Sequence, residues 1–152
     1  MSLTRLFFKK ADPRATLPSQ RKGDVGLDVR CLDDFTIPAG KTIKVSTGLQ
    51  LAKSPESGLG AVFLKMEDRS SMALKGIFSH GGIIAPSYRG VFHVILFNSR
   101  DADYTAKAGD KIAQIVVYPA AFNHQWSYVE SEECDEVEAS ARGAGGFGST
   151  GK

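Results

Sequence analysis

The sequence predicts an all-β domain of the sandwich or jelly-roll type. Three observations support this class: short β-branched apolar stretches recur along the chain, turns containing Gly or Pro separate them, and only one short stretch has helical character. The chain has 152 residues, which is enough for one domain with a hydrophobic core.

Each predicted element follows from its residue pattern. Apolar, β-branched stretches between turns predict strands, and the one helical signal covers 70–76. The predicted strands are 4–10, the two halves of 35–51 around the turn at 38–40, 58–66, the two halves of 81–98 around the turn at 85–87, and 109–119. The 81–98 stretch is predicted to form a β-hairpin, and 51–60 a surface turn.

Apolar character is most continuous over 91–97, which predicts a strand buried on both faces. In a domain of this size, such a strand favours packing between subunits of a symmetric oligomer. From Ser131 onward the composition becomes acidic and then rich in glycine. We therefore expect one β domain over 1–133 and a flexible C-terminal arm over 134–152.

The bulk composition excludes several classes of function. A net charge of +2 is too small to indicate nucleic-acid binding, and no apolar run approaches the length of a membrane span. We therefore expect neither nucleic acid nor a membrane as a partner. Cys31 and Cys134 lie far apart and the three histidines are scattered, so we expect no zinc site and an intracellular location, cytoplasmic or inside a host cell.

The C-terminal stretch RGAGGFGSTGK, residues 142–152, nearly matches a phosphate-binding P-loop. A P-loop must follow a buried strand and open a helix, whereas this stretch follows an acidic, polar segment. Two interpretations remain: a loose terminus, or an arm that orders over an anion with Arg142, glycine amides, Ser149 and Thr150 as donors. Phe147 favours the arm, because solvating tails avoid aromatic residues.

Two internal stretches combine turns with charged or hydroxyl side chains. The stretch VGLD at 25–28 places Asp28 after a glycine turn, either as a turn cap or as a functional carboxylate. Arg69, Ser70 and Ser71 stand where a predicted strand meets the predicted helix, which suits either a helix cap or a phosphate.

Two further stretches place polar groups beside apolar strands. Gln114 lies inside an apolar strand, so its amide is either satisfied in the core or faces a ligand. The 81–90 stretch offers backbone donors and acceptors beside Tyr88, in an arrangement suited to the edge of a planar base.

Taken in order, these stretches resemble the trimeric dUTPase family over nearly the whole chain. The matching motifs are V-G-L-D at 25–28, R-S-S at 69–71, G-I-I-x-x-S-Y-R-G at 82–90, G-D-K-I-A-Q at 109–114 and R-G-x-G-G-F-G-S-T-G at 142–151. The resemblance implies a β-clip or distorted jelly roll and a homotrimer with sites at subunit interfaces. It also implies hydrolysis of dUTP to dUMP and pyrophosphate, which keeps uracil out of DNA.

The resemblance implies roles for single residues at the phosphate end of the substrate. Arg69, Ser70 and Ser71 would hold the phosphates. Gln114 would lie near the α-phosphate and the attacking water, and Asp28 would reach a Mg²⁺ ion through a water molecule.

At the base end, the resemblance places the backbone of Gly82, Ile83 and Ile84 along the uracil edge, and Ala85 follows them in the substrate-binding stretch. His93 would face that pocket, and Tyr88 would press against the deoxyribose and exclude a 2′-hydroxyl group.

The C-terminal arm would close over an active site, that of a neighbouring subunit. Arg142 would clamp the γ-phosphate and Phe147 would stack on uracil. Gly148, Ser149 and Thr150 would cover the phosphate chain.

The sequence departs from the family pattern at Ala85, where the family carries the Asp that activates water. A positioned general base contributes about 10²–10⁴-fold to the rate, so we expect intact binding and impaired turnover. Asp68, which replaces a small residue or Pro, is a candidate substitute carboxylate. The alternatives are an engineered loss of the base, or a natural loss that leaves a dUTP-binding regulatory protein.

Two other functions are disfavoured by particular residues. The related dCTP deaminases need a Glu in the strand after the hairpin, where 93–98 has none, and an Arg where this chain has Leu74. A purely structural jelly-roll subunit would not explain Arg142 and Phe147 in a glycine-rich tail.

Overall fold

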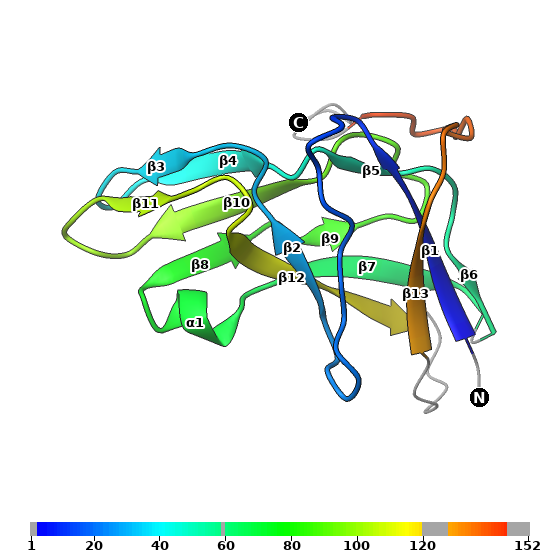
Figure 1. Ribbon diagram of the computed structural model, residues 1–152, viewed down its shortest axis with the longest axis horizontal. Helices are drawn as coiled ribbons and strands as arrows, with labels where there is room; N and C mark the ends of the chain where they lie inside the picture. The colour runs from blue at the N-terminus through cyan, green and yellow to red at the C-terminus, as the bar shows by residue number, and fades with distance from the viewer. Residues whose placement is uncertain (1–2, 59, 120–127, 146–152) are drawn as a thin grey trace.

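The computed structural model describes residues 3–58, 60–119 and 128–145, and in them strands dominate (Figure 1). The elements are β1 (Leu3–Lys10), β2 (Leu27–Arg30), β3 (Phe35–Ile37), β4 (Thr42–Ser46), β5 (Leu49–Leu51), β6 (Glu56–Ser57), β7 (Val62–Glu67), α1 (Ser70–Ala73), β8 (Ile77–His80), β9 (Ile83–Ile84), β10 (His93–Asn98), β11 (Tyr104–Ala106), β12 (Lys111–Pro119) and β13 (Tyr128–Glu133). The prediction of an all-β fold with one short helix is confirmed.

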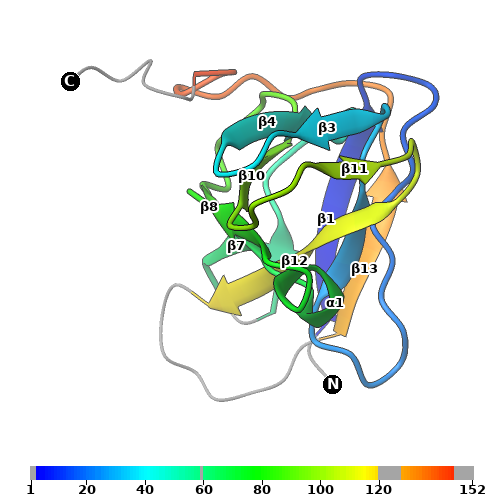
Figure 2. The same ribbon diagram turned by 90° about the vertical axis from the view of Figure 1, so that its left-hand side faces the viewer.

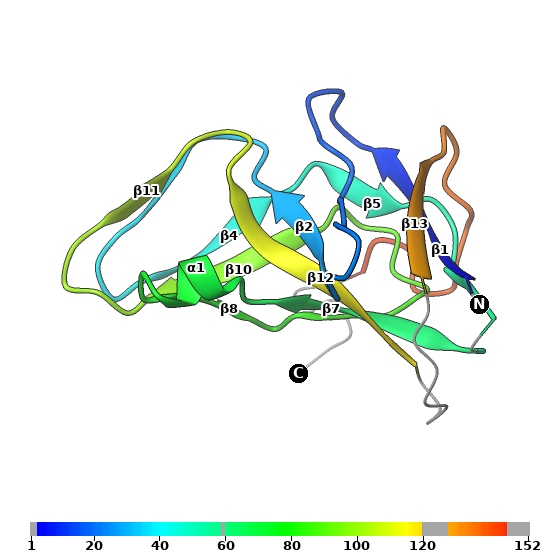
Figure 3. The same ribbon diagram turned by 60° about the horizontal axis from the view of Figure 1, so that its bottom comes forward.

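The strands form several small sheets rather than one continuous one. Their orders are β13-β1-β5 with β6 also on β1, β4-β10-β8, β11-β3, and β2-β12-β7-β9. Figures 1 and 3 show β1 and β13 side by side at one end of the molecule and β3 and β11 at the other. After β13, the segment 134–145 crosses the upper end of the molecule in Figures 1 and 2.

The sheets share one hydrophobic cluster, which fixes their relative positions. It joins fully buried side chains from β1, β7, β10 and β12, including Phe8, Leu64, Leu96 and Ile115. Phe8 packs edge-on against Phe92, with ring centroids 5.9 Å apart. Because Phe92 directly precedes β10, this contact ties the approach to that strand to β1.

The predicted β-hairpin at 81–98 is wrong. β9 pairs with β7, whereas β10 pairs with β4 and β8. The intervening residues are too many for a tight hairpin, and the turn closed by Tyr88 N and Ala85 O redirects the chain between two sheets. As a result the 85–92 segment is a loop that can wall a pocket.

The prediction that 91–97 is buried on both faces is also wrong. Val94 and Leu96 are buried, but His93, Ile95 and Phe97 are only half-buried. β10 is the middle strand of an antiparallel sheet, and such a sheet packs one face on the core.

Besides the short β6 and β11, the strands β8 and β13 form where none is predicted. β8 follows the turn after α1, and β13 lies in the acidic region and pairs in parallel with β1, with Leu6 opposite Ser131. Backbone groups make the ladder between β1 and β13, so the polar side chains of β13 give little sign of it. Within the described residues, no helix has both the length and the apolar character needed to cross a membrane.

Buried Asn98 offers a test of how the β10 end is held. Its Nδ2 donates to Ile37 O at 2.9 Å and to Ala102 O at 2.8 Å, and its Oδ1 accepts from Arg100 N at 3.0 Å. Asn98→Ala should lower the free energy of unfolding by about 2–3 kcal/mol, because one buried and two partly buried backbone groups lose their partner. Chemical denaturation measures this, with the exposed Thr36→Ala as control. A loss no larger than that of the control would contradict the assignment.

Candidate active site

Two pockets collect most of the predicted site residues. We call the first the cationic pocket; its cavity of about 290 Å³ is lined by Arg21, Asp24, Val25, Gly26, Asp28, Arg69, Ser70, Lys111 and Gln114. We call the second the aromatic pocket; its cavity of about 230 Å³ is lined by Gly81, Ile83, Ile84, Tyr88, Phe92, His93, Ile95 and Arg142. They share no residue, and they involve β2 and β9, the opposite edges of one sheet.

The carboxylate of Asp28 organises the cationic pocket. Its Oδ1 accepts from Arg69 Nε at 2.8 Å, and its Oδ2 lies 2.6 Å from Lys111 Nζ. Burial alone would raise the pKa of Asp28, but the ion pairs with Lys111 and Arg69 outweigh it and lower the pKa below its ordinary value. The carboxylate therefore stays ionised at neutral pH and holds two cations in one place.

Arg69 is held in position on several sides. It precedes α1, and its Nη1 donates to Ser71 Oγ at 3.2 Å and to Lys111 O at 3.3 Å. Ser70 lines the pocket, whereas Ser71 enters the site only through this bond to Arg69. The four-residue helix is too short to supply a strong dipole, so the positive charge here comes from side chains.

Gln114 faces the pocket from β12, where it lies opposite Asp28 of β2. Its Nε2 donates to Asp68 O at 2.8 Å, so the amide is partly satisfied and also faces a cavity. Gly26 makes this placement feasible, because a Cβ there would come within 2.1 Å of Gln114 Oε1.

Asp68 does not join either pocket. Its Oδ1 accepts a hydrogen bond from Ser79 N at the β8 strand, which fixes the carboxylate away from the cationic pocket. Only its backbone carbonyl contributes to the site, through Gln114.

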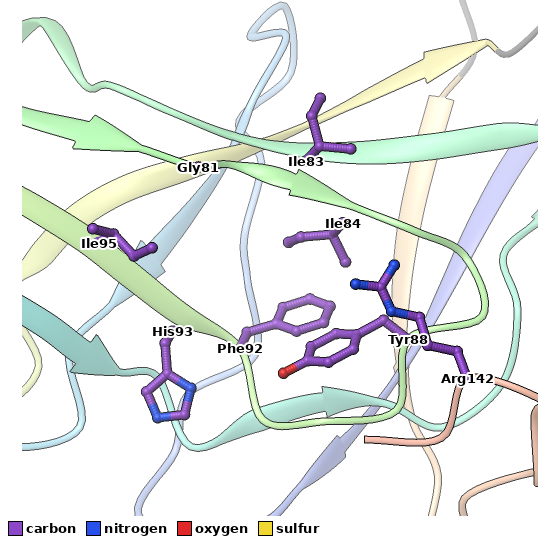
Figure 4. A pocket seen from close by; sticks show the side chains of 8 residues that line it. All are labelled: Gly81, Ile83, Ile84, Tyr88, Phe92, His93, Ile95 and Arg142. Atoms are coloured by element: carbon purple, nitrogen blue, oxygen red, sulfur yellow. The ribbon is translucent and has the colours of Figure 1, made fainter. Parts of the chain in front are cut away.

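The aromatic pocket is built on two stacked rings (Figure 4). Tyr88 and Phe92 lie with their centroids 6.3 Å apart and their planes 11° apart. The guanidinium carbon of Arg142 is 5.7 Å from the Tyr88 centroid, a cation–π distance. Gly90 leaves the room for this ring, since a Cβ there would come within 2.3 Å of the Tyr88 hydroxyl.

The β9 edge forms one wall of the aromatic pocket. Gly82 O accepts from Met66 N at 2.7 Å, and a Cβ on Gly82 would come within 2.2 Å of Met66 O, so only glycine fits. Ile83 is 62% exposed and Ile84 lines the cavity. Because β9 is the edge strand of its sheet, its outer backbone groups are available to a ligand.

His93 and Tyr88 converge on one carbonyl. His93 Nδ1 lies 2.8 Å from Val91 O and the Tyr88 hydroxyl donates to the same oxygen at 3.3 Å. A carbonyl only accepts, so Nδ1 carries the proton. Burial lowers the pKa of His93, aided by the charge of Lys44, which keeps the ring neutral at neutral pH.

Ala85 does not line the aromatic pocket, and its carbonyl closes the turn to Tyr88 N. None of the described residues lining this pocket carries a carboxylate. The position where the sequence lacks the expected Asp is therefore not filled there by another acidic side chain.

Arg89 was missed as a functional residue, although it lies in the S-Y-R-G stretch. Its side chain is 6% exposed. Its Nε donates to Glu138 O, its Nη1 to Pro86 O and Tyr88 O, and its Nη2 to Ser54 Oγ. One buried guanidinium thus joins the 85–92 loop, which we call the pocket loop, to the start of the C-terminal arm.

The C-terminal arm begins against its own chain's pocket loop. Arg89 N donates to Gly143 O at 2.8 Å, and Arg142 reaches the aromatic pocket of the same chain. Four predicted arm residues lie outside the described residues: Phe147, Gly148, Ser149 and Thr150. Whether the arm serves its own or a neighbouring subunit therefore stays a prediction.

A metal ion fits the cationic pocket only together with a ligand. The described residues contain no group of three or more His, Cys, Asp or Glu side chains that could hold one. Both oxygens of Asp28 already face cations, which favours contact with an ion through water. Mg²⁺ commonly takes one or two carboxylates and completes its shell with water and phosphate oxygens, so a bound phosphate chain would supply the rest.

The chain is similar to known proteins in sequence and in fold. The dUTPase family profile matches residues 12–151. The deoxyuridine 5′-triphosphate nucleotidohydrolase of Clostridium acetobutylicum is 35% identical, with 98% of each chain covered. The protein of the same name from Solibacter usitatus is 40% identical, with 95% of each chain covered. The solved native dUTPase of EIAV has a TM-score of 0.61 at 24% identity, covering 84% of this chain and 97% of that one, and supports the fold.

Replacing Arg89 tests whether it anchors the arm. Arg89→Met should lower the free energy of unfolding by about 2–4 kcal/mol, because three partly buried backbone carbonyls lose their donor. Amide hydrogen exchange over 138–143 should accelerate more than exchange in β10. The exposed Arg100→Met is the matched control. Unchanged exchange in the arm, with stability like that of the control, would show that Arg89 does not hold it.

Proposed function

The chain belongs to the dUTPase family, and we propose that it hydrolyses dUTP to dUMP and pyrophosphate by attack of water at the α-phosphorus. The observation that carries this proposal is the cationic pocket, where Asp28 holds Arg69 and Lys111 beside Gln114. Water must attack a phosphorus inside a polyanion, so catalysis needs positioning and charge neutralisation more than covalent chemistry.

At the phosphate end, Arg69, Ser70 and Ser71 bind the phosphate oxygens. Gln114 orients the attacking water: its Nε2 donates to Asp68 O, which leaves its Oε1 to accept a hydrogen bond from the water. A water that donates to Oε1 can point a lone pair at the α-phosphorus, which is the geometry that the step requires.

Mg²⁺ is the cofactor that we propose, held by the substrate phosphates and, through water, by Asp28. When bound, such an ion neutralises charge on the phosphate chain.

At the base end, we propose that the backbone of Gly82, Ile83 and Ile84 pairs with the uracil edge and that Tyr88 packs on deoxyribose. Cytosine would place a donor against a donor, which costs it about ten- to a thousandfold in binding. His93 lines the same pocket as a neutral ring. The 2′-hydroxyl of a ribonucleotide would clash with the face of the Tyr88 ring or lose its hydration there. The pocket therefore selects deoxyribose over ribose.

We propose a homotrimer in which each site combines pockets from different copies. The cationic and aromatic pockets share no residue and lie at opposite edges of one sheet, which supports a site completed between subunits. The arm completes the site, with Arg142 and Ser149, Thr150 and Gly148 on the phosphates and Phe147 on uracil.

Cys31 and Cys134 are free thiols, which supports an intracellular location.

Release of pyrophosphate tests the function directly. The protein should release pyrophosphate from dUTP far faster than from dCTP or UTP, and ¹⁸O from labelled water should appear in dUMP. Label in pyrophosphate would contradict attack at the α-phosphorus, and equal rates on all three nucleotides would contradict the role of the aromatic pocket. Tight binding of dUTP without turnover would instead favour a regulatory dUTP-binding protein, which the alanine at 85 makes the second candidate.

Restoring the missing carboxylate tests the role of position 85. Ala85→Asp should raise kcat by about 10²–10⁴-fold and leave KM nearly unchanged, because a general base acts on the chemical step. Asp68→Ala serves as the second arm, since its carboxylate is engaged by Ser79 N and should not be the base. A fall of kcat in Asp68→Ala to background would instead assign the base to Asp68.

Crowding Gln114 tests its role without removing it. Gly26→Ala should lower kcat about 10²-fold, because the new methyl displaces the amide that orients water. Gln114→Ala should lower kcat by a similar factor, and the double variant should be no worse than either single one. Additive losses would show that Gly26 acts independently of Gln114.

A further inference from the structure

One basic side chain of the cationic pocket belongs to none of the sequence motifs. Arg21 lines this pocket together with Arg69 and Lys111, although it comes from the loop at 20–25 that precedes β2. Its neighbour Lys22 is also exposed but does not line the pocket. The loop therefore presents one of two adjacent basic residues to the site.

The basic side chains that the motifs contain are already engaged. Arg69 and Lys111 share the two oxygens of Asp28, and Arg69 makes further bonds to Ser71 and to a backbone carbonyl. Among the described residues, the Arg21 guanidinium has neither a hydrogen-bond nor an ion-pair partner. Its donors are thus the ones most available to an anion entering the pocket.

The loop that carries Arg21 is fixed before any ligand binds. Gln20 Nε2 donates to Asp24 O at 2.7 Å, and Asp24 N donates to Arg21 O at 3.0 Å. At the loop's end, Asp28 N donates to Ser19 O at 2.8 Å. These bonds tie the loop to β2, so little backbone entropy remains to be lost when Arg21 meets a ligand.

The charge of the pocket favours the same conclusion. Three basic and two acidic side chains line it, and one of the acidic ones is shared by two of the basic ones. Part of the positive charge of Arg69 and Lys111 is offset by Asp28. The polyanionic chain of a nucleoside triphosphate needs more positive charge than these two side chains then provide. A guanidinium also matches phosphate oxygens with paired N–H donors.

We propose that Arg21 is a further phosphate-binding residue of this site and contacts the triphosphate chain of dUTP. This inference rests on the proposed hydrolysis of dUTP. Arg21 is exposed where it lines the pocket, so we expect it to contribute to substrate binding rather than to the chemical step.

Steady-state kinetics of Arg21→Ala test the proposal, with Lys22→Ala as the matched control in the same loop. Arg21→Ala should raise KM for dUTP about tenfold with kcat nearly unchanged, the size expected of a partly exposed charge-assisted hydrogen bond. The increase should shrink as salt rises, and Arg21→Lys should recover part of it. Lys22→Ala should behave like the unmodified protein.

Two results would overturn the proposal: equal KM values for Arg21→Ala and Lys22→Ala, or a loss of kcat without a change in KM. If the unmodified protein does not hydrolyse dUTP, the proposed function fails and calorimetry with inorganic tripolyphosphate decides the role of Arg21 separately. Weaker binding by Arg21→Ala than by Lys22→Ala would then support it, and equal binding would refute it.

Discussion

The ion pairs of Asp28 are the interaction on which the cationic pocket depends. Without this carboxylate, Arg69 and Lys111 would repel each other at the meeting point of β2, β12 and the end of β7. The pairs lower the pKa of Asp28, so their contribution to stability is present above the ordinary pKa of an aspartate and is lost as pH falls through the lowered value. Asp28 thereby holds Arg69 and Lys111 together as a positive site for phosphate, while its own charge limits the repulsion between them.

A second charge, the buried guanidinium of Arg89, performs the corresponding task for the aromatic pocket. It satisfies carbonyls of the pocket loop and of the arm at once, and so sets where Tyr88 and Arg142 meet. The two pockets are each complete as local structures, yet they lie at opposite edges of a sheet. We propose that copies of the chain bring unlike pockets together, so that one nucleotide contacts both.

The sequence was most informative where side chains carry the signal. Alternating apolar residues predict the β class, and the motifs around Asp28, Arg69 and Gln114 point to the side chains that line the cationic pocket. Strands made by backbone pairing of polar residues, such as β13, have no such signal. Partners distant in sequence were equally hidden: nothing local shows that Arg89 binds Glu138 O, or that Gly26 makes room for Gln114.

Complementation between two inactive variants tests the central claim that each site combines pockets from different copies. Arg69→Ala damages the cationic pocket and Tyr88→Ala the aromatic one. Co-assembled at equal amounts, they should recover about a quarter of the activity of the unmodified protein, because in a symmetric oligomer that fraction of sites pairs two intact pockets. A mixture no more active than the sum of the separate variants would contradict the claim and place both pockets of a working site in one chain.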